Sequence, residues 1–167
     1  MLFIIILFYI YGISYYADIS VLGIYTGCEW WKYITFNFIH TNILHLLLNS
    51  AIFLLYWKML KPFNLKIIIP VIIISSTIAA TLSTYQNPTI GASAIVMSMM
   101  GLITSGLKKV PQRKVIMLVV FSFITTFFFA PHVNTLIHVY SFSISFVTGL
   151  LLKRKIYVAS KRYNKNK

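Results

Sequence analysis

Six apolar stretches, each close to the thickness of a membrane when helical, restrict the fold of this chain more than any other feature. They run approximately over residues 2–16, 45–60, 67–84, 92–107, 115–130 and 135–152. A helix needs about 20 apolar residues to cross a hydrocarbon core. Only 10% of the 167 residues are charged, against about a quarter in soluble domains. The pattern predicts an all-α, polytopic membrane protein with six transmembrane helices, divided into a membrane domain at 1–155 and a basic cytoplasmic tail at 156–167.

The basic residues alternate between the connecting segments in a way that predicts the topology. Fourteen of the 15 lysines and arginines lie between stretches two and three, between four and five, or after stretch six. The other, Lys32, lies with Glu29 in the first connection, which joins stretches one and two. Because basic residues accumulate on the cytoplasmic side, we expect both termini there, in a multi-pass protein of the plasma (inner) membrane. The net charge of +13 is thus a topology signal, and the basic residues are placed to contact membrane lipid. It does not indicate a nucleic-acid-binding surface.

The scarcity of acidic side chains excludes several kinds of intramembrane enzyme. Asp18 and Glu29 are the only acids and lie near or in the first connection, which excludes an intramembrane aspartate pair and argues against a Ser-His-Asp triad. No H-E-x-x-H sequence occurs, and the single cysteine, Cys28, has no partner for a disulfide or a metal site. We therefore expect no metal and no cofactor. A serine-histidine dyad is the remaining arrangement for nucleophilic catalysis.

Ser93 and His138 are candidates for that dyad because they occupy matching positions in two apolar stretches. Each lies 15 residues before a lysine that ends its stretch, Lys108 or Lys153. If both helices rise from one face at about 1.5 Å per residue, both side chains lie roughly 22 Å above it, inside a core about 30 Å thick. Taken singly, the serine is explained as a helix cap and the histidine as an inter-helix hydrogen bond. Their common depth favours a nucleophile and its base.

Small residues follow both candidates at helical spacing and predict close packing of the two helices. They are Ala94, Ser98, Gly101 and Ser105 in the fourth stretch, and Ser141, Ser145 and Gly149 in the sixth. Small side chains let two helix backbones approach closely in a membrane. Such an approach would bring the Ser93 hydroxyl within reach of the His138 imidazole. Pro88 and Gly91 indicate an irregular start to the fourth helix, whose first N–H groups are free to bind an oxyanion.

The second stretch carries polar side chains at its start. His45 and Asn49 are four residues apart and share one helix face, where both can donate a hydrogen bond at membrane depth. Such donors suit an oxyanion hole, and structural hydrogen bonds are the alternative. We expect His40, at the edge of the connection, to tie the first connection to this helix, and His132 to be exposed in a short outer loop.

These motifs, in this order, resemble the rhomboid intramembrane serine proteases. The matching sequences are Trp31-Lys32 in the first connection, His40-x4-His45-x3-Asn49 in the second stretch, Gly91-Ala92-Ser93 at the start of the fourth and His138 in the sixth. The resemblance implies that Ser93 is the nucleophile and His138 the general base. It also implies that His45, Asn49 and the Ser93 backbone N–H bind the oxyanion.

The resemblance further implies a reaction and its partners. The reaction is cleavage of a peptide bond in or next to a transmembrane helix, with lateral access near the fifth stretch. The partners are single-span membrane-protein substrates, with small residues at the cut, and membrane lipid. His40, Gly91 and Trp31 complete the structural motif. None of these motifs sets an oligomeric state.

The chain departs from the family pattern at five positions. Ala94 replaces a glycine after the serine, Met97 an aromatic residue one turn later, and Lys32 an arginine, whose forked donor geometry it lacks. Ser141 and Ser145 replace glycines in the sixth stretch. A rhomboid-like protein that binds membrane clients without cutting them is therefore one alternative, supported by Ala94 alone. A small transporter with a polar path is another, although no internal repeat is present.

The charge distribution makes the topology testable with reporter fusions. Fusions at Gln112 and after Lys167 are expected to report a cytoplasmic location, and a fusion at Asn87 an external one, because 14 of 15 basic residues mark the cytoplasmic side. Paired alkaline phosphatase and fluorescent-protein reporters at each site make the measurement. An external signal at Gln112 would contradict the six-span topology.

Overall fold

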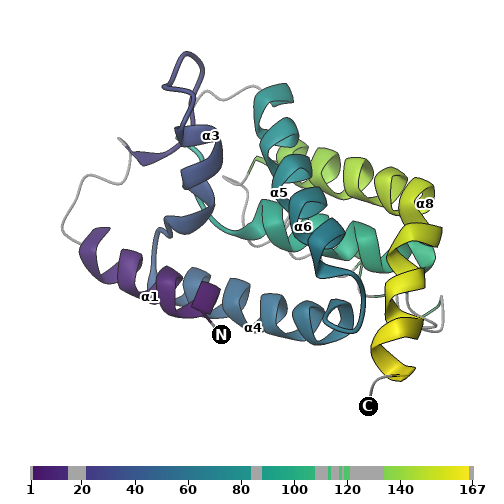
Figure 1. Ribbon diagram of the computed structural model, residues 1–167. Helices are drawn as coiled ribbons and strands as arrows, with labels where there is room; N and C mark the ends of the chain where they lie inside the picture. The colour runs from purple at the N-terminus through teal and green to yellow at the C-terminus, as the bar shows by residue number, and fades with distance from the viewer. Residues whose placement is uncertain are drawn as a thin grey trace.

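The computed structural model of the chain describes residues 2–14, 22–83, 88–107 and 134–165, with a few single positions between 108 and 133. The described chain is mostly helical (Figure 1). The elements are α1 (Leu2–Ser14), α3 (Lys32–Thr35), the 3₁₀ helix η1 (Phe36–Phe38), α4 (Ile43–Leu60), α5 (Leu65–Leu82), α6 (Ser93–Leu102), the π-helical turn η2 (Ile103–Leu107) and α8 (Thr135–Lys165). Within these residues β structure is limited to one isolated bridge, between Ile24 and Thr89.

Three of the described helices are long and apolar enough to cross a membrane: α4, α5 and the Thr135–Ile156 part of α8. Ser93–Gly106 is a shorter apolar helix, and α1 has 13 residues. A helical membrane protein is thereby confirmed at the level of fold class. The expected stretch at 115–130 lies outside the described residues, so the count of six spans stays a prediction.

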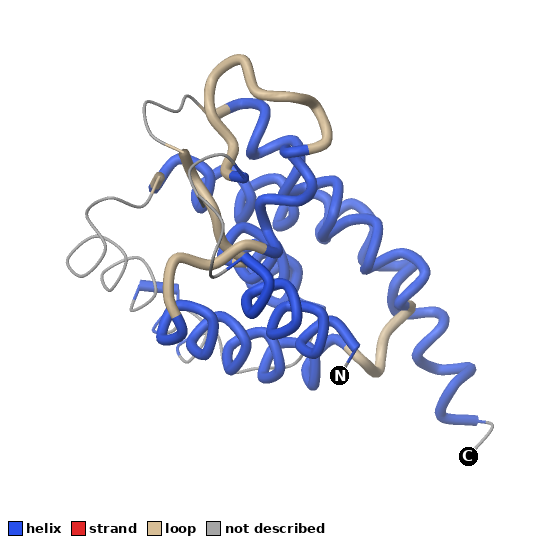
Figure 2. The backbone as a smooth tube through the Cα atoms, turned by 90° about the vertical axis from the view of Figure 1, so that its left-hand side faces the viewer, coloured by secondary structure: helices blue, strands red, loops and turns tan. Residues whose placement is uncertain are grey.

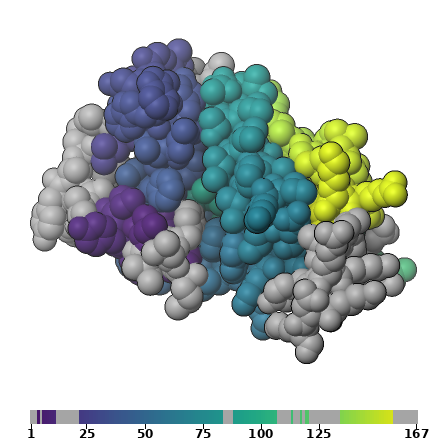
Figure 3. All heavy atoms as spheres, viewed as in Figure 1, coloured from purple at the N-terminus to yellow at the C-terminus, as the bar shows by residue number. Residues whose placement is uncertain are grey.

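Large apolar side chains cover the outer faces of the long helices. Exposed examples on α4, α5 and α8 are Leu44, Leu48, Leu55, Ile74, Leu82 and Leu151. Figure 3 shows the α5 side chains across the middle of one face, between the first connection and α8. An exposed apolar surface of this extent marks contact with a membrane or a partner, and the length of the helices favours lipid.

Helix α6 is buried at the centre of this arrangement. It packs against α4, α5 and α8, and every residue from Ala94 to Leu102 is buried. Figure 1 shows it crossing the molecule behind α5, and Figure 2 shows the described backbone, mostly helical, from the side. A helix that is apolar on all sides is stable only when enclosed, and these neighbours enclose it.

Helices α6 and α8 run parallel and in contact along their length. Ser145 Oγ donates to the Ser98 carbonyl at 2.7 Å, and Ser98 Oγ donates to the Ser141 carbonyl at 3.5 Å, pairs that lie 47 and 43 residues apart. A Cβ added at Gly101 would collide with the Phe142 carbonyl and the Ser145 hydroxyl. The predicted close packing of the two small-residue faces is confirmed.

A lysine of α8 lies beside the C-terminal end of η2, which continues α6. Gly106, at the end of η2, has a positive φ of 87°, a conformation that favours glycine. The Lys153 ammonium of α8 would lie 2.8 Å from a Cβ built there. A cation beside a helix C-terminus is favourable because the carbonyl groups there carry partial negative charge. The contact between the two helices therefore extends from Ser98 to Gly106 and Lys153.

The absence of space at Gly101 predicts that added volume at this position will destabilise the helix pair. Gly101→Val is expected to lower the free energy of unfolding by about 1–3 kcal/mol, because the added groups meet α8 backbone that cannot move aside. Thermal unfolding in detergent measures the change. Val147→Leu, which adds volume on the exposed side of α8, is the control and should leave the midpoint unchanged. Equal midpoints for both variants would refute the close contact.

Candidate active site

The segment that leads into α6 is held by the first connection through backbone hydrogen bonds. Ile24 N donates to the Thr89 carbonyl at 3.0 Å and Thr89 N to the Ile24 carbonyl at 2.9 Å. Two residues later, Gly91 N donates to the Phe36 carbonyl at 2.9 Å. These three bonds fix the path of the chain immediately before Ser93.

His40 provides a fourth attachment of the same segment. Its imidazole is fully buried, and Nε2 accepts the Ala92 N–H at 3.4 Å. The sequence predicted a link from His40 to the second stretch. In the structure the ring contacts His45 of that stretch, and in addition it joins the residues before α4 to the residues before α6.

Ser93 is the first residue of α6 and not its cap. The N-cap is Ala92, whose side chain forms no capping hydrogen bond. The N–H groups of Gly91 and Ala92 are occupied by the contacts described above. By helix geometry, the N–H groups of Ser93 and the next two residues have no carbonyl one turn earlier to bind. Free donors and the positive end of the helix dipole therefore surround the Ser93 side chain.

The Ser93 hydroxyl and the His138 imidazole are in hydrogen-bond contact. Ser93 Oγ lies 2.8 Å from His138 Nε2, and His138 is 3% exposed. When Nδ1 carries the ring proton, Nε2 accepts the Ser93 O–H, which is the geometry of a nucleophile and its base. Among the described residues, His138 Nδ1 has no hydrogen-bond partner.

The His45 imidazole lies against the chain just before Ser93. Gly91 has φ +124°, and a Cβ built on it would come within 2.6 Å of His45 Cε1. Only glycine fits both the backbone conformation and the neighbouring ring. His45 Nδ1 lies 3.3 Å from Thr41 Oγ1, and its ring meets His40 edge-on at 5.1 Å between centroids. The structure thus brings His45, His40 and Gly91 together beside the dyad.

Asn49 lies one turn after His45 on the same helix. It is 7% exposed, and its Nδ2 donates to the His45 carbonyl at 3.0 Å. One amide hydrogen is therefore engaged within α4, and the other is left for a further acceptor.

Ala94 does not crowd the dyad in this fold. It is fully buried and belongs to a cluster that includes Ala79 and Ala80 of α5 and Ile137 of α8. The small alanines of α5 leave room for the methyl group. The Ala94 methyl group therefore packs within this cluster.

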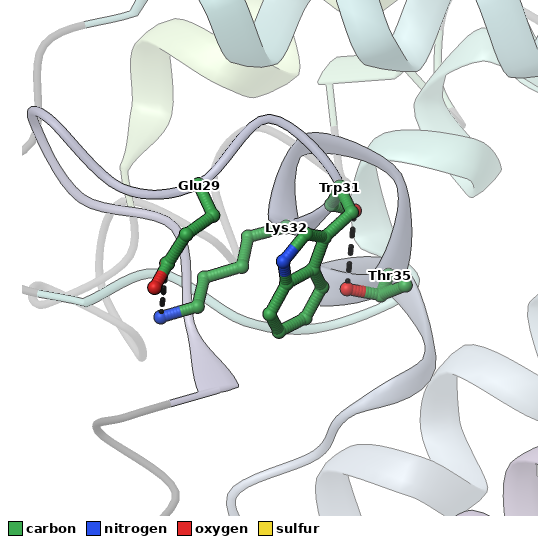
Figure 4. Close-up of polar contacts among 4 residues, drawn as sticks. All are labelled: Glu29, Trp31, Lys32 and Thr35. Carbon is green, nitrogen blue, oxygen red and sulfur yellow. Dashed lines mark hydrogen bonds and ion pairs between the residues drawn. The ribbon is translucent and has the colours of Figure 1, made fainter.

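Lys32 has a structural role that its place in a loop did not indicate (Figure 4). It is 3% exposed, pairs with Glu29 at 2.9 Å and lies 4.9 Å from the Tyr25 ring centroid and 5.5 Å from that of Trp31. The Lys32 hydrogen bond lowers the pKa of Glu29, and the same bond raises the pKa of Lys32. The pair therefore stabilises the first connection above the ordinary pKa of Glu29, and the effect is lost as the pH falls through its lowered value.

Several contacts that build the site had no signature in the sequence. Ile24, Phe36 and Thr89 act through backbone atoms, which any residue could supply. Of the candidates named from the sequence, His132 lies outside the described residues. No group of three or more metal-binding side chains occurs in the part of the chain that the structure describes.

A family comparison agrees with the helical membrane fold. The model of the Rhomboid domain matches residues 27–152, which include both members of the dyad and the whole segment before α6. The chain belongs to the rhomboid family and is a multi-pass membrane protein. No sequence among curated proteins matches it.

Proposed function

We propose that this protein is an intramembrane serine endopeptidase that cuts peptide bonds in or near transmembrane helices. The observation that carries the proposal is the 2.8 Å contact between Ser93 Oγ and His138 Nε2. This contact joins α6 and α8, and no carboxylate among the described residues bonds to His138, so the imidazole itself acts as the base in this proposal. Rhomboid family membership supports the same reaction, since most members are proteases of this kind.

In the proposed reaction, His138 Nε2 takes the Ser93 proton as the hydroxyl oxygen attacks the carbonyl carbon of the peptide bond. The resulting imidazolium gives that proton to the leaving amine, and an acyl-enzyme on Ser93 remains. A water molecule then loses a proton to His138 and attacks the ester. Release of the carboxylate product returns Ser93 to its hydroxyl form.

The oxyanion that forms during each attack needs hydrogen-bond donors. The Ser93 N–H at the start of α6 is one, and the proposed side-chain donors are His45 and Asn49. The position of His45 over Gly91 supports its part in this set. In a site with little water, such donors contribute more than they would in solution.

The proposed partners are single-span membrane-protein substrates and membrane lipid, in the plasma (inner) membrane with both termini cytoplasmic. The parallel run of α6 and α8 supports six spans, because the chain must return across the membrane between them. We also propose the division into a membrane domain at 1–155 and a basic tail at 156–167. Helix α8 itself continues through that boundary to Lys165.

The dyad is tested by incubating purified protein with a transmembrane reporter and with a fluorophosphonate probe. Ser93→Ala and His138→Ala are each expected to abolish cleavage and labelling while leaving the protein folded and inserted. The double variant should be no worse than either single one, because residues that act as a unit are not additive. Turnover that persists in Ser93→Ala would disprove a serine mechanism. Absence of labelling in the wild type would favour a client-binding protein or a transporter.

The oxyanion donors make a separate prediction about rate. Asn49→Ala is expected to slow cleavage and Ser93 labelling by roughly 10²–10³, the cost of losing one such donor, without abolishing either. His45→Ala should behave alike. Asn42→Gly, which removes the side-chain cap of α4 but no proposed donor, controls for loss of helix stability. Unchanged labelling in Asn49→Ala would leave that residue with a structural role only.

A further inference from the structure

Ser141 carries a buried hydroxyl that nothing in the described structure uses. It is fully buried, and its Oγ has no hydrogen-bond partner there. Other buried helix serines, such as Ser83 and Ser105, donate to a carbonyl three or four residues earlier. Ser141 does not, although an unpaired polar group is costly to bury.

The main chain of Ser141, by contrast, is fully occupied in helix packing. Its carbonyl accepts Ser98 Oγ at 3.5 Å and Ser145 Oγ at 2.9 Å. These contacts between α6 and α8 would survive removal of the Ser141 side chain. The packing of α6 against α8 therefore needs a small residue at position 141 but not its hydroxyl.

The preceding turn of the same helix holds another buried polar atom without a partner among the described residues, on the His138 ring. His138 Nε2 faces Ser93, and the buried Nδ1 on the opposite side of the ring has no partner. Residues three apart on a helix are neighbours on one face. Helical side chains tilt back toward the N-terminus, so the Ser141 side chain lies over the turn that carries His138.

We propose that Ser141 is a positioning residue whose hydroxyl accepts the Nδ1–H of His138. A turn of the serine side chain, or one bridging water molecule, completes the bond across this single helical turn. The bond holds the proton on Nδ1, so that Nε2 stays free to accept the Ser93 proton. It also stabilises the imidazolium that follows, the task performed by the acid of a triad. This inference rests on the proposed function, since it assigns His138 the part of the base.

The test compares Ser141→Ala with Ser145→Ala, a matched serine one turn further along the same face. Ser141→Ala is expected to slow fluorophosphonate labelling of Ser93 roughly three- to tenfold, the contribution of one neutral hydrogen bond. It should lower kcat for reporter cleavage with KM and the unfolding midpoint unchanged. Ser145→Ala loses the bond to Ser98. It should lower the midpoint and leave the labelling rate of the folded protein unchanged.

A second readout does not depend on activity. In histidine-labelled protein, the Nδ1–H proton resonance of His138, assigned by its loss in His138→Ala, should move upfield in Ser141→Ala and stay in place in Ser145→Ala. If Ser141→Ala keeps both the wild-type labelling rate and the wild-type position of the His138 resonance, the inference is overturned. If wild-type Ser93 fails to label while the resonance still depends on Ser141, the proposed protease function fails and the hydrogen bond stands.

Discussion

Close contact between α6 and α8 is the constraint on which the rest of the site depends. In a bilayer, apolar side chains gain little from leaving lipid for one another, so helices associate through packing and hydrogen bonds. Here Gly101 leaves no space for a side chain against α8, so the two backbones are in direct contact. This register places Ser93 and His138 at the same level of the pair. A wider separation would leave both polar groups buried and unpaired.

The first connection contributes as much to the site as the long helices do. Its backbone pairs with Thr89 and Gly91, and His40 binds the next N–H. These bonds use the donors just before α6, and the first N–H groups of the helix itself have no backbone carbonyl one turn earlier to bind. Lys32, enclosed by Glu29 and two aromatic rings, stabilises the connection from within. A connection stabilised in this way can position the start of α6 although its described helices are short.

Among the residues that the structure describes, no acidic side chain bonds to His138 Nδ1, the atom that an acid orients in many serine proteases. In a low-dielectric interior a carboxylate would be costly to bury, and none of the transmembrane stretches contains one. Neutral groups must then fix the imidazole. Packing of α8 against α6 sets its position, and one turn further along α8 the Ser141 hydroxyl is buried without a partner among the described residues. Serine at a position where the family has glycine is compatible with the contact because the neighbouring bonds use its backbone carbonyl.

The sequence alone determined the helical membrane class, the family and the pairing of Ser93 with His138. The membrane class and the pairing follow from segment length, charge, depth and small-residue spacing, and the family from the resemblance of short motifs, all of which can be read along the chain. Tertiary structure alone decided where the Ala94 methyl packs, which groups enclose Lys32, what His40 binds and which hydroxyl stays unused. Each of these involves backbone atoms or partners distant in the chain. Backbone donors and acceptors are the same in nearly every residue, so their pairing leaves no trace in the order of side chains.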